Sequence, residues 1–335
     1  MVLIVLTDPH PINALRRLLG RTASILIPLS ILFIKYYPDL GRGYGRWMGE
    51  VHYTGVSTGK NGLGEICLLF GIASVWQVLE LFGGERQGVQ RNRSLMVQSL
   101  LLAMILWLFS IVDSMTSLSC FLLATCVLFA IRFRVFARYG FMIHALVLVT
   151  VLIPVSVTLL GLSPYLLQTM GRDSTLTERT DIWAMVIHLT PNRWFGAGYD
   201  SFWLGPRLEA MISKITHWWI PKQSHDGYLE IYANLGWLGI GCLAYVILWG
   251  YRRVIRAWRR NLPASNLMLA YFLTGLISNL TEAAFFRMMI PVWLFFLVAI
   301  TFPQRTLGIR HDNRPVSVTP LAEPESRGSL VGLGV

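Results

Sequence analysis

Long apolar runs are the feature that most constrains the fold of this chain. They recur eight times, and most approach the roughly 20 residues that a helix needs to cross a bilayer. Apolar residues make up 54% of the 335 residues and charged residues only 14%, whereas soluble domains carry about 25% charged residues. We therefore predict an all-α integral membrane protein with about eight transmembrane helices. The predicted spans are 21–37, 61–82, 95–113, 118–131, 139–160, 227–250, 264–282 and 288–302.

Basic residues are distributed unequally between the two sides of these spans. With the N-terminus placed inside, the inner segments hold eighteen of the 29 Lys and Arg residues. The short outer loops at 113–119 and 281–287 hold only Arg287. The positive-inside rule then predicts that both termini are cytoplasmic and that residues 161–226 lie outside. The rule also explains the net charge of +11, so nucleic acid is not indicated as a partner.

The predicted spans divide the chain into four parts. Residues 1–160 and 227–302 hold the N-terminal and C-terminal transmembrane helices, and 161–226 form one large outer loop. Residues 303–335 are rich in Pro, Ser, Gly and Glu without periodicity, which predicts a disordered cytoplasmic tail. The four cysteines lie in apolar runs and form no CxxC spacing, so neither a metal site nor a disulfide framework is indicated.

Two polar features near the spans allow more than one interpretation. The glycine-rich segment 38–60 ends in Lys60, which suits a flexible connector whose lysine reaches the headgroups, and less clearly a loop on the substrate side. Glu230 and Asn234 lie four residues apart on one helical face and are able to hydrogen-bond each other. A structural pair is at least as good an interpretation of them as a catalytic one.

A helix is predicted at the start of the outer segment. Thr175 and Glu178 form a capping box, and the helix should stop before Pro191. Arg179 lies in the first turn, on the same face as Trp183 and Val186. A helix dipole disfavours a cation there, unless an anion docks at the helix start. Arg179 therefore either binds an anion, with Arg172 nearby, or pairs locally with Glu178 or Asp181.

The sixth span begins with a histidine at its outer end. Ser224 is a plausible N-cap, and His225, Tyr228, Tyr232, Gly236 and Gly239 then follow with helical spacing. A histidine near neutral pKa is a reasonable general base. From the residues alone, a histidine solvated at the bilayer edge is the favoured interpretation.

Three sequence blocks resemble the O-antigen ligase and polysaccharide polymerase superfamily of bacterial inner-membrane proteins, and the exopolysaccharide polymerase branch most. LTERTDIW is similar to the family's arginine block and places that arginine at Arg179. HDGYLEIYANLG fits the family's histidine block, from His225 to Gly236. Weaker similarity covers GVSTGKNGLG around Lys60 and the segment of Asn279, Glu282 and Trp293.

The resemblance implies glycosyl transfer at the periplasmic face of the bacterial inner membrane. The donor would be an oligosaccharide on undecaprenyl diphosphate, and the acceptor a sugar hydroxyl. Arg179 and Arg172 would stabilise the leaving diphosphate, and His225 would take the acceptor proton. Lys60, Tyr228 and Glu230 are expected at the substrate site. The transfer would need neither metal nor cofactor, and the expected partners are membrane lipids and polysaccharide export and chain-length proteins.

Three functions remain open from the sequence. The first is a polymerase of lipid-linked repeat units for exopolysaccharide or O-antigen. The second is a ligase that moves a finished glycan to a lipid or protein acceptor. The third is a non-enzymatic glycan transporter or assembly partner. A transporter is expected to place its polar groups at mid-membrane, whereas this chain concentrates them in one outer segment, which favours an enzyme.

Overall fold

The computed structural model describes residues 7–44, 51–83, 88–159, 175–214 and 222–312. Arg172 and most of the predicted C-terminal tail lie outside these residues. Arg179 lies in a described helix, but its side chain is not among those described.

Helices coincide with all eight predicted spans. Four of them are long and apolar enough to cross a membrane: α2 (Pro11–Tyr36), α4 (Lys60–Gly83), α5 (Val89–Val112) and α12 (Gly227–Arg259). The other four are α6 (Met115–Ala130), α8 (Met142–Leu159), α13 (Ser265–Ser278) and α14 (Pro291–Asp312), and their apolar stretches are shorter. The helical membrane architecture is confirmed, whereas the number of complete crossings stays a prediction.

The centre of the bundle is formed by α4 and α13. Almost every residue of α13 is buried, and the buried residues of α4 run from Leu63 to Trp76 around the whole helix. The hydroxyl of Tyr271 donates to the Leu69 carbonyl across this contact at 2.9 Å. By contrast, α5, α8 and α12 expose large apolar side chains such as Trp107, Leu148 and Leu248, as expected of helices that face lipid.

The last of the long helices, α12, is broken at Gly236. This residue has φ 61° and ψ −156°, a conformation that is essentially restricted to glycine. A Cβ atom there would lie 2.4 Å from the carbonyl carbon of Trp194. The prediction of one helical stripe from His225 to Gly239 is therefore wrong, because the helix axis changes direction inside the stripe.

The glycine-rich loop before α11 fills this break. The amides of Ala197 and Gly198 donate to the carbonyls of Ala233 and Asn234 at 2.9 and 2.8 Å. On the other side of the break, Trp237 N donates to the Arg193 carbonyl at 2.9 Å. The loop thus satisfies backbone groups that the interrupted helix cannot pair, which is how broken helices are tolerated in membrane proteins.

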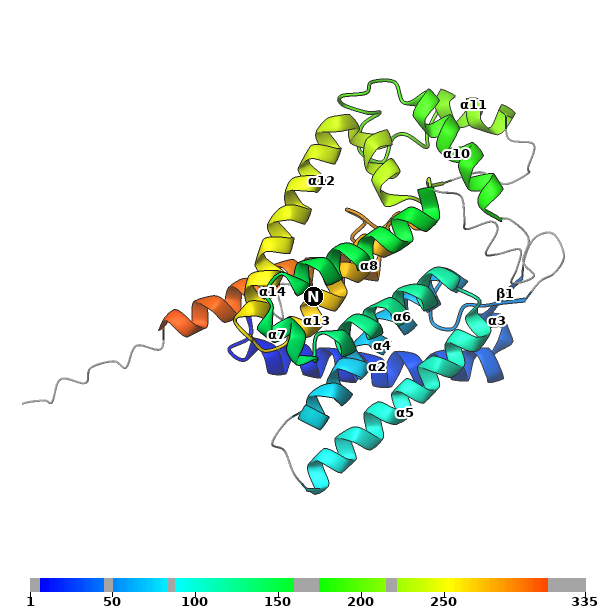
Figure 1. Cartoon of the computed structure of the whole chain (residues 1–335). Coiled ribbons are helices and arrows are strands. Elements are labelled where there is room, and N and C mark those ends of the chain that lie inside the picture. The colour runs from blue at the N-terminus through cyan, green and yellow to red at the C-terminus, as the bar shows by residue number, and fades with distance from the viewer. Residues whose placement is uncertain (1–6, 45–50, 84–87, 160–174, 215–221, 313–335) are drawn as a thin grey trace, which may run out of the picture.

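The described part of the outer segment is a small folded unit with its own core. It contains α10 (Thr175–Leu189) and α11 (Pro206–Lys214), which Figure 1 shows at the end of the molecule where α12 begins. α10 ends before Pro191, as predicted. The buried residues of this core are Ile182, Val186, Phe202, Trp203, Met211 and Ala233. Because Ala233 belongs to α12, this unit is packed onto the first part of that helix.

The first outer loop is more ordered than the sequence suggested. After the short helix α3 (Pro38–Gly41), strands β1 (Arg42–Tyr44) and β2 (Val51–Tyr53) pair in an antiparallel hairpin. Arg42 Nε donates to the Ile34 carbonyl at 2.9 Å, which attaches the hairpin to the end of α2. On the opposite side of the bundle, the short helix α7 (Arg134–Arg138) connects α6 and α8.

Candidate functional site

The start of α12 is capped by Asp226. Its Oδ1 accepts from the amides of Tyr228 and Leu229 at 2.8 and 2.9 Å. The prediction that Ser224 is the N-cap is wrong, because the helix begins two residues later than the sequence suggested. Ser224 instead donates from Oγ to the Asp226 carbonyl at 2.7 Å and closes the turn that precedes the helix.

His225 lies in this turn with a left-handed backbone, φ 53°. Such a conformation is uncommon for a residue other than glycine, and it often occurs at functional sites. The imidazole is about a quarter exposed, and its Nδ1 lies 3.6 Å from Glu282 Oε2. Asn61 Nδ2 donates to the other oxygen of Glu282 at 2.7 Å. The histidine therefore faces a carboxylate from the segment that follows α13, and Asn61 of α4 holds that carboxylate in place.

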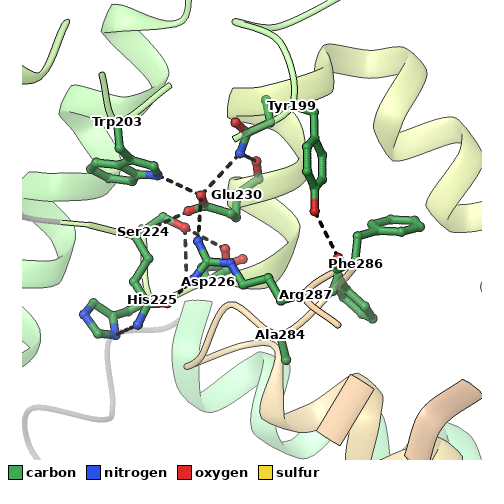
Figure 2. A network of polar contacts seen from close by, with 12 residues as sticks. Tyr199, Trp203, Ser224, His225, Asp226, Glu230, Ala284, Phe286 and Arg287 are labelled. Carbon is green, nitrogen blue, oxygen red and sulfur yellow. Dashed lines mark hydrogen bonds and ion pairs between the residues drawn. The ribbon is translucent and has the colours of Figure 1, made fainter. Parts of the chain in front are cut away.

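Glu230 lies at the centre of the polar network that Figure 2 shows. Its side chain is buried, and its Oε1 accepts from Trp203 Nε1 at 2.7 Å and from Asn234 Nδ2 at 3.2 Å. Its Oε2 accepts from Ser224 N at 2.8 Å. The predicted hydrogen bond between Glu230 and Asn234 is present. The carboxylate connects the outer unit, the turn that holds His225 and the first part of α12.

Arg287 completes the network from the loop between α13 and α14. Its Nη2 lies 3.3 Å from Glu230 Oε1, and its Nη1 donates to Gln223 Oε1 at 2.7 Å. This fixes the amide of Gln223 so that its NH₂ group faces His225 Nδ1, at 3.2 Å. Nδ1 therefore has two neighbours, an amide donor and the Glu282 carboxylate. When the neutral ring carries its proton on Nε2, Nδ1 accepts from Gln223. When the proton is on Nδ1 it faces the Glu282 carboxylate, and Nε2 is then the acceptor.

A second set of contacts fixes the helix start to α13. Gly227 N donates to the Asn279 carbonyl at 2.7 Å. The side-chain oxygen of Asn279 accepts from the amides of Ala284 and Phe285 at 2.9 and 3.0 Å. A Cβ atom at position 227 would lie 2.1 Å from Asn279 Oδ1, so only glycine permits this approach. The position of His225 is consequently determined by α13 as well as by α12.

The remaining predicted site residues have different environments. Tyr228 is half-buried, and its hydroxyl donates to the Leu276 carbonyl at 3.0 Å. Lys60 is half-buried at the first position of α4, next to Asn61. Arg179 lies in the second turn of α10, whose Trp183 donates from Nε1 to the Ser224 carbonyl at 2.8 Å. This bond places the helix that carries Arg179 against the turn that carries His225.

Burial affects the electrostatics of the cap. It raises the pKa of the Asp226 carboxyl, and the nearby Glu230 acts in the same direction, while the two backbone hydrogen bonds oppose the shift. Within the described ranges, no three His, Cys, Asp or Glu side chains lie close enough together to hold a metal ion.

Sequence reasoning missed three of the connecting residues, namely Trp203, Gln223 and Arg287. The sequence did single out Arg287, because it is the only Lys or Arg in the two short outer loops at 113–119 and 281–287. Trp203 and Gln223 had none, since their partners are 27 and 64 residues away along the chain.

The fold and the site together define a helical membrane protein with a partly exposed, carboxylate-supported histidine at one end of its bundle. A comparison with protein families narrows the class of protein to which the chain is similar. The model of the O-antigen ligase family matches residues 101–244, a range that includes α10, the glycine-rich loop and His225. The resemblance to the O-antigen ligase and polysaccharide polymerase superfamily is therefore confirmed over this part of the chain. Among curated proteins, none matches the chain significantly.

Proposed function

We propose that this protein polymerises lipid-linked oligosaccharide repeat units at the periplasmic face of the bacterial inner membrane. The donor is a glycan on undecaprenyl diphosphate, and the acceptor is a sugar hydroxyl of a second lipid-linked unit. The family match supports glycan transfer of the ligase and polymerase type. The single observation that carries the assignment of the site is the placement of His225 in a strained turn beside Glu282.

His225 acts as the general base in this proposal. The imidazole takes the proton of the acceptor hydroxyl as the oxygen bonds to the anomeric carbon of the donor. The bond between that carbon and the diphosphate oxygen breaks, and the electron pair leaves with the diphosphate. Glu282, 3.6 Å from Nδ1, stabilises the imidazolium that results. Asn61 holds Glu282 in place through its 2.7 Å hydrogen bond.

The leaving diphosphate needs positive charge, which the arginines of the outer segment supply. Arg179 is assigned to this role, with Arg172 as a second contact, because guanidinium forks match phosphate oxygens. The Trp183 bond to Ser224 supports this arrangement, since it keeps α10 next to the histidine turn. Lys60 is assigned to the headgroup side of the site, and Tyr228 and Glu230 maintain its shape.

The test is polymer synthesis from lipid-linked donor by purified variants in detergent or nanodiscs. A general base contributes roughly 10²–10⁴-fold in rate, so His225→Ala and His225→Gln should both lose nearly all chain growth. The matched control is His188→Gln, because His188 is exposed on the neighbouring helix α10. Near-normal polymer from His225→Gln would remove His225 from catalysis.

Product analysis separates the polymerase from the ligase. In cells that lack the protein, a polymerase defect leaves single repeat units on the lipid. A ligase defect leaves full-length polymer that is not attached to its final acceptor. Accumulation of the latter would overturn the polymerase assignment while keeping the glycan-transfer chemistry.

A further inference from the structure

A small pocket lies beside Glu282, on the side of the carboxylate that α4 and α6 cover. Its cavity of about 10 Å³ has room for one particle the size of a water molecule. Side chains that carry oxygen reach it from α4, α6 and the end of α13. They are Asn61, Glu65, Thr116, Ser117, Ser278 and Glu282.

The two carboxylates in this pocket are not balanced by equal positive charge. Glu282 is close to His225 and accepts from Asn61. Among the described residues, Glu65 has no hydrogen bond and no ion pair, although it lies inside α4. A carboxylate in a membrane helix is costly unless it is paired or neutralised. The charge of the pocket is therefore incomplete without a further positive species.

Ser278 independently indicates a missing ligand. Its side chain is 4% exposed, and its Oγ is buried without a hydrogen-bond partner among the described residues, although it lines the pocket. A buried hydroxyl that makes no bond costs roughly 1–3 kcal/mol, so such groups usually have a partner. An occupant of the pocket would supply one.

The backbone of α4 is built to bring hydroxyl groups close to Glu65. A Cβ atom at Gly64 would lie 2.7 Å from the Oγ atoms of both Ser114 and Ser117. Glycine therefore allows α6 to approach α4 at this level. Ser114 Oγ donates to Ser117 Oγ at 3.1 Å, which fixes the orientation of the serine that lines the pocket.

We propose that this pocket binds a single monovalent cation of the size of Na⁺, held by Glu65, Glu282 and Ser278. Carboxylate, hydroxyl and amide oxygens are hard ligands that suit hard cations. Divalent calcium takes six to eight oxygens, commonly from several carboxylates, whereas one of the two carboxylates here is shared with His225 and Asn61. The bound cation would neutralise Glu65 and join α4 to α13 behind the histidine. This inference does not rest on the proposed glycan transfer.

The test measures the thermal unfolding midpoint of the purified full-length protein at constant ionic strength. Sodium chloride is exchanged for choline chloride over a concentration series, because a ligand that binds only the folded state raises the midpoint in a saturable manner. We expect a saturable rise in sodium and none in choline. An equal response to both salts, or no response, would mean that the pocket holds only water and would overturn the proposal.

Two variants and a matched control connect the effect to the pocket. Removal of residues that merely support metal ligands costs affinity roughly 10–100-fold, so Ser278→Ala should shift half-saturation to at least about tenfold higher sodium. Glu65→Gln should unfold at the same temperature with or without sodium. Thr274→Ala is the control, because Thr274 lies one turn deeper on α13 with an equally buried, unbonded hydroxyl that does not line the pocket.

Further outcomes distinguish other occupants. A midpoint that responds to pH but not to sodium, and loses this response in Glu65→Gln, would mean that Glu65 holds a proton and would overturn the cation site. Saturation by micromolar calcium in place of sodium would equally overturn the monovalent assignment. An unchanged half-saturation concentration in Ser278→Ala would remove Ser278 from the site and refute the geometry proposed here.

Discussion

Glu230→Gln tests whether one buried carboxylate holds the outer unit to the helix that follows His225. The substitution keeps the shape of the side chain but replaces one acceptor oxygen with an NH₂ group. Oε1 serves three donors, Trp203, Asn234 and Arg287, whereas Oε2 serves only Ser224 N. The least costly orientation therefore places the NH₂ group against the Ser224 amide.

The magnitude follows from these contacts. A buried donor left without an acceptor costs roughly 1–3 kcal/mol. The loss of charge also weakens the contact with Arg287, but that side chain is 28% exposed, so the screened contribution is no more than about 1 kcal/mol. The total of about 2–4 kcal/mol should lower the unfolding midpoint of a chain of this length by on the order of 3–6 °C.

The assay is thermal unfolding in detergent, followed by tryptophan fluorescence and combined with a polymer assay. Because Ser224 precedes His225, its displacement should also slow the reaction by roughly 10–100-fold, as expected for small misplacements of reacting groups. The control is Glu209→Gln, the same chemical change on the exposed face of α11. An unfolding midpoint for Glu230→Gln equal to that of the parent protein would refute the reasoning.

Three further predictions address the turn, the break and the arginines. Gly236→Ala should lower the free energy of unfolding by more than the roughly 1–3 kcal/mol of backbone strain alone, because the added Cβ would also meet the Trp194 backbone. In the control Gly241→Ala the added Cβ would lie in open space, so the unfolding midpoint should not fall. Asp226→Ala should cost about 1 kcal/mol of capping, but Asp226→Asn keeps the acceptor. Because burial raises the pKa of Asp226, its contribution to stability is complete at low pH and is lost as the pH rises through that pKa. The stability of Asp226→Asn should therefore increase relative to that of the parent protein as the pH rises. A stability difference that stays constant with pH would contradict this. Arg179→Lys should lose most polymer synthesis, and Arg172→Lys less, because a lysine does not replace a guanidinium fork; normal polymer from Arg179→Ala at normal expression would leave the local pairing with Glu178 or Asp181 as the better account.

The positions of the membrane helices were predictable because the cost of burying polar groups in lipid imposes a strong and local pattern on the sequence. The end of α10 before Pro191 and the pair of Glu230 and Asn234 were also predictable, since each depends on residues that are close together in the sequence. The capping box of Thr175 and Glu178 stays a prediction, because α10 begins at Thr175 itself and these two side chains are not among those described. The break at Gly236 was not predictable, because isolated glycines are common in membrane helices. Its cause is the docking of Trp194, more than forty residues earlier in the chain.

Contacts between distant segments account for the rest of what sequence reasoning missed. Ser224 and Asp226 are both good caps by residue type, and the choice between them depends on Glu230, which binds the Ser224 amide. The position of Arg287 beside Gln223 depends on how α13 and α14 place their connecting loop. Such pairings have no periodicity from which they could be read.

The break at Gly236 also has a consequence for the depth at which the histidine lies. At 1.5 Å per residue, an unbroken α12 would place His225 about 17 Å further along the axis than Gly236. The segment from Trp237 to Arg259, about 35 Å long by the same rise, already matches the thickness of the hydrocarbon core. Because the chain turns back at the glycine, His225 instead meets Glu282 at the outer end of α13. The reversal returns the imidazole toward the outer ends of the bundle helices, which is the depth that the proposed lipid-linked donor would require.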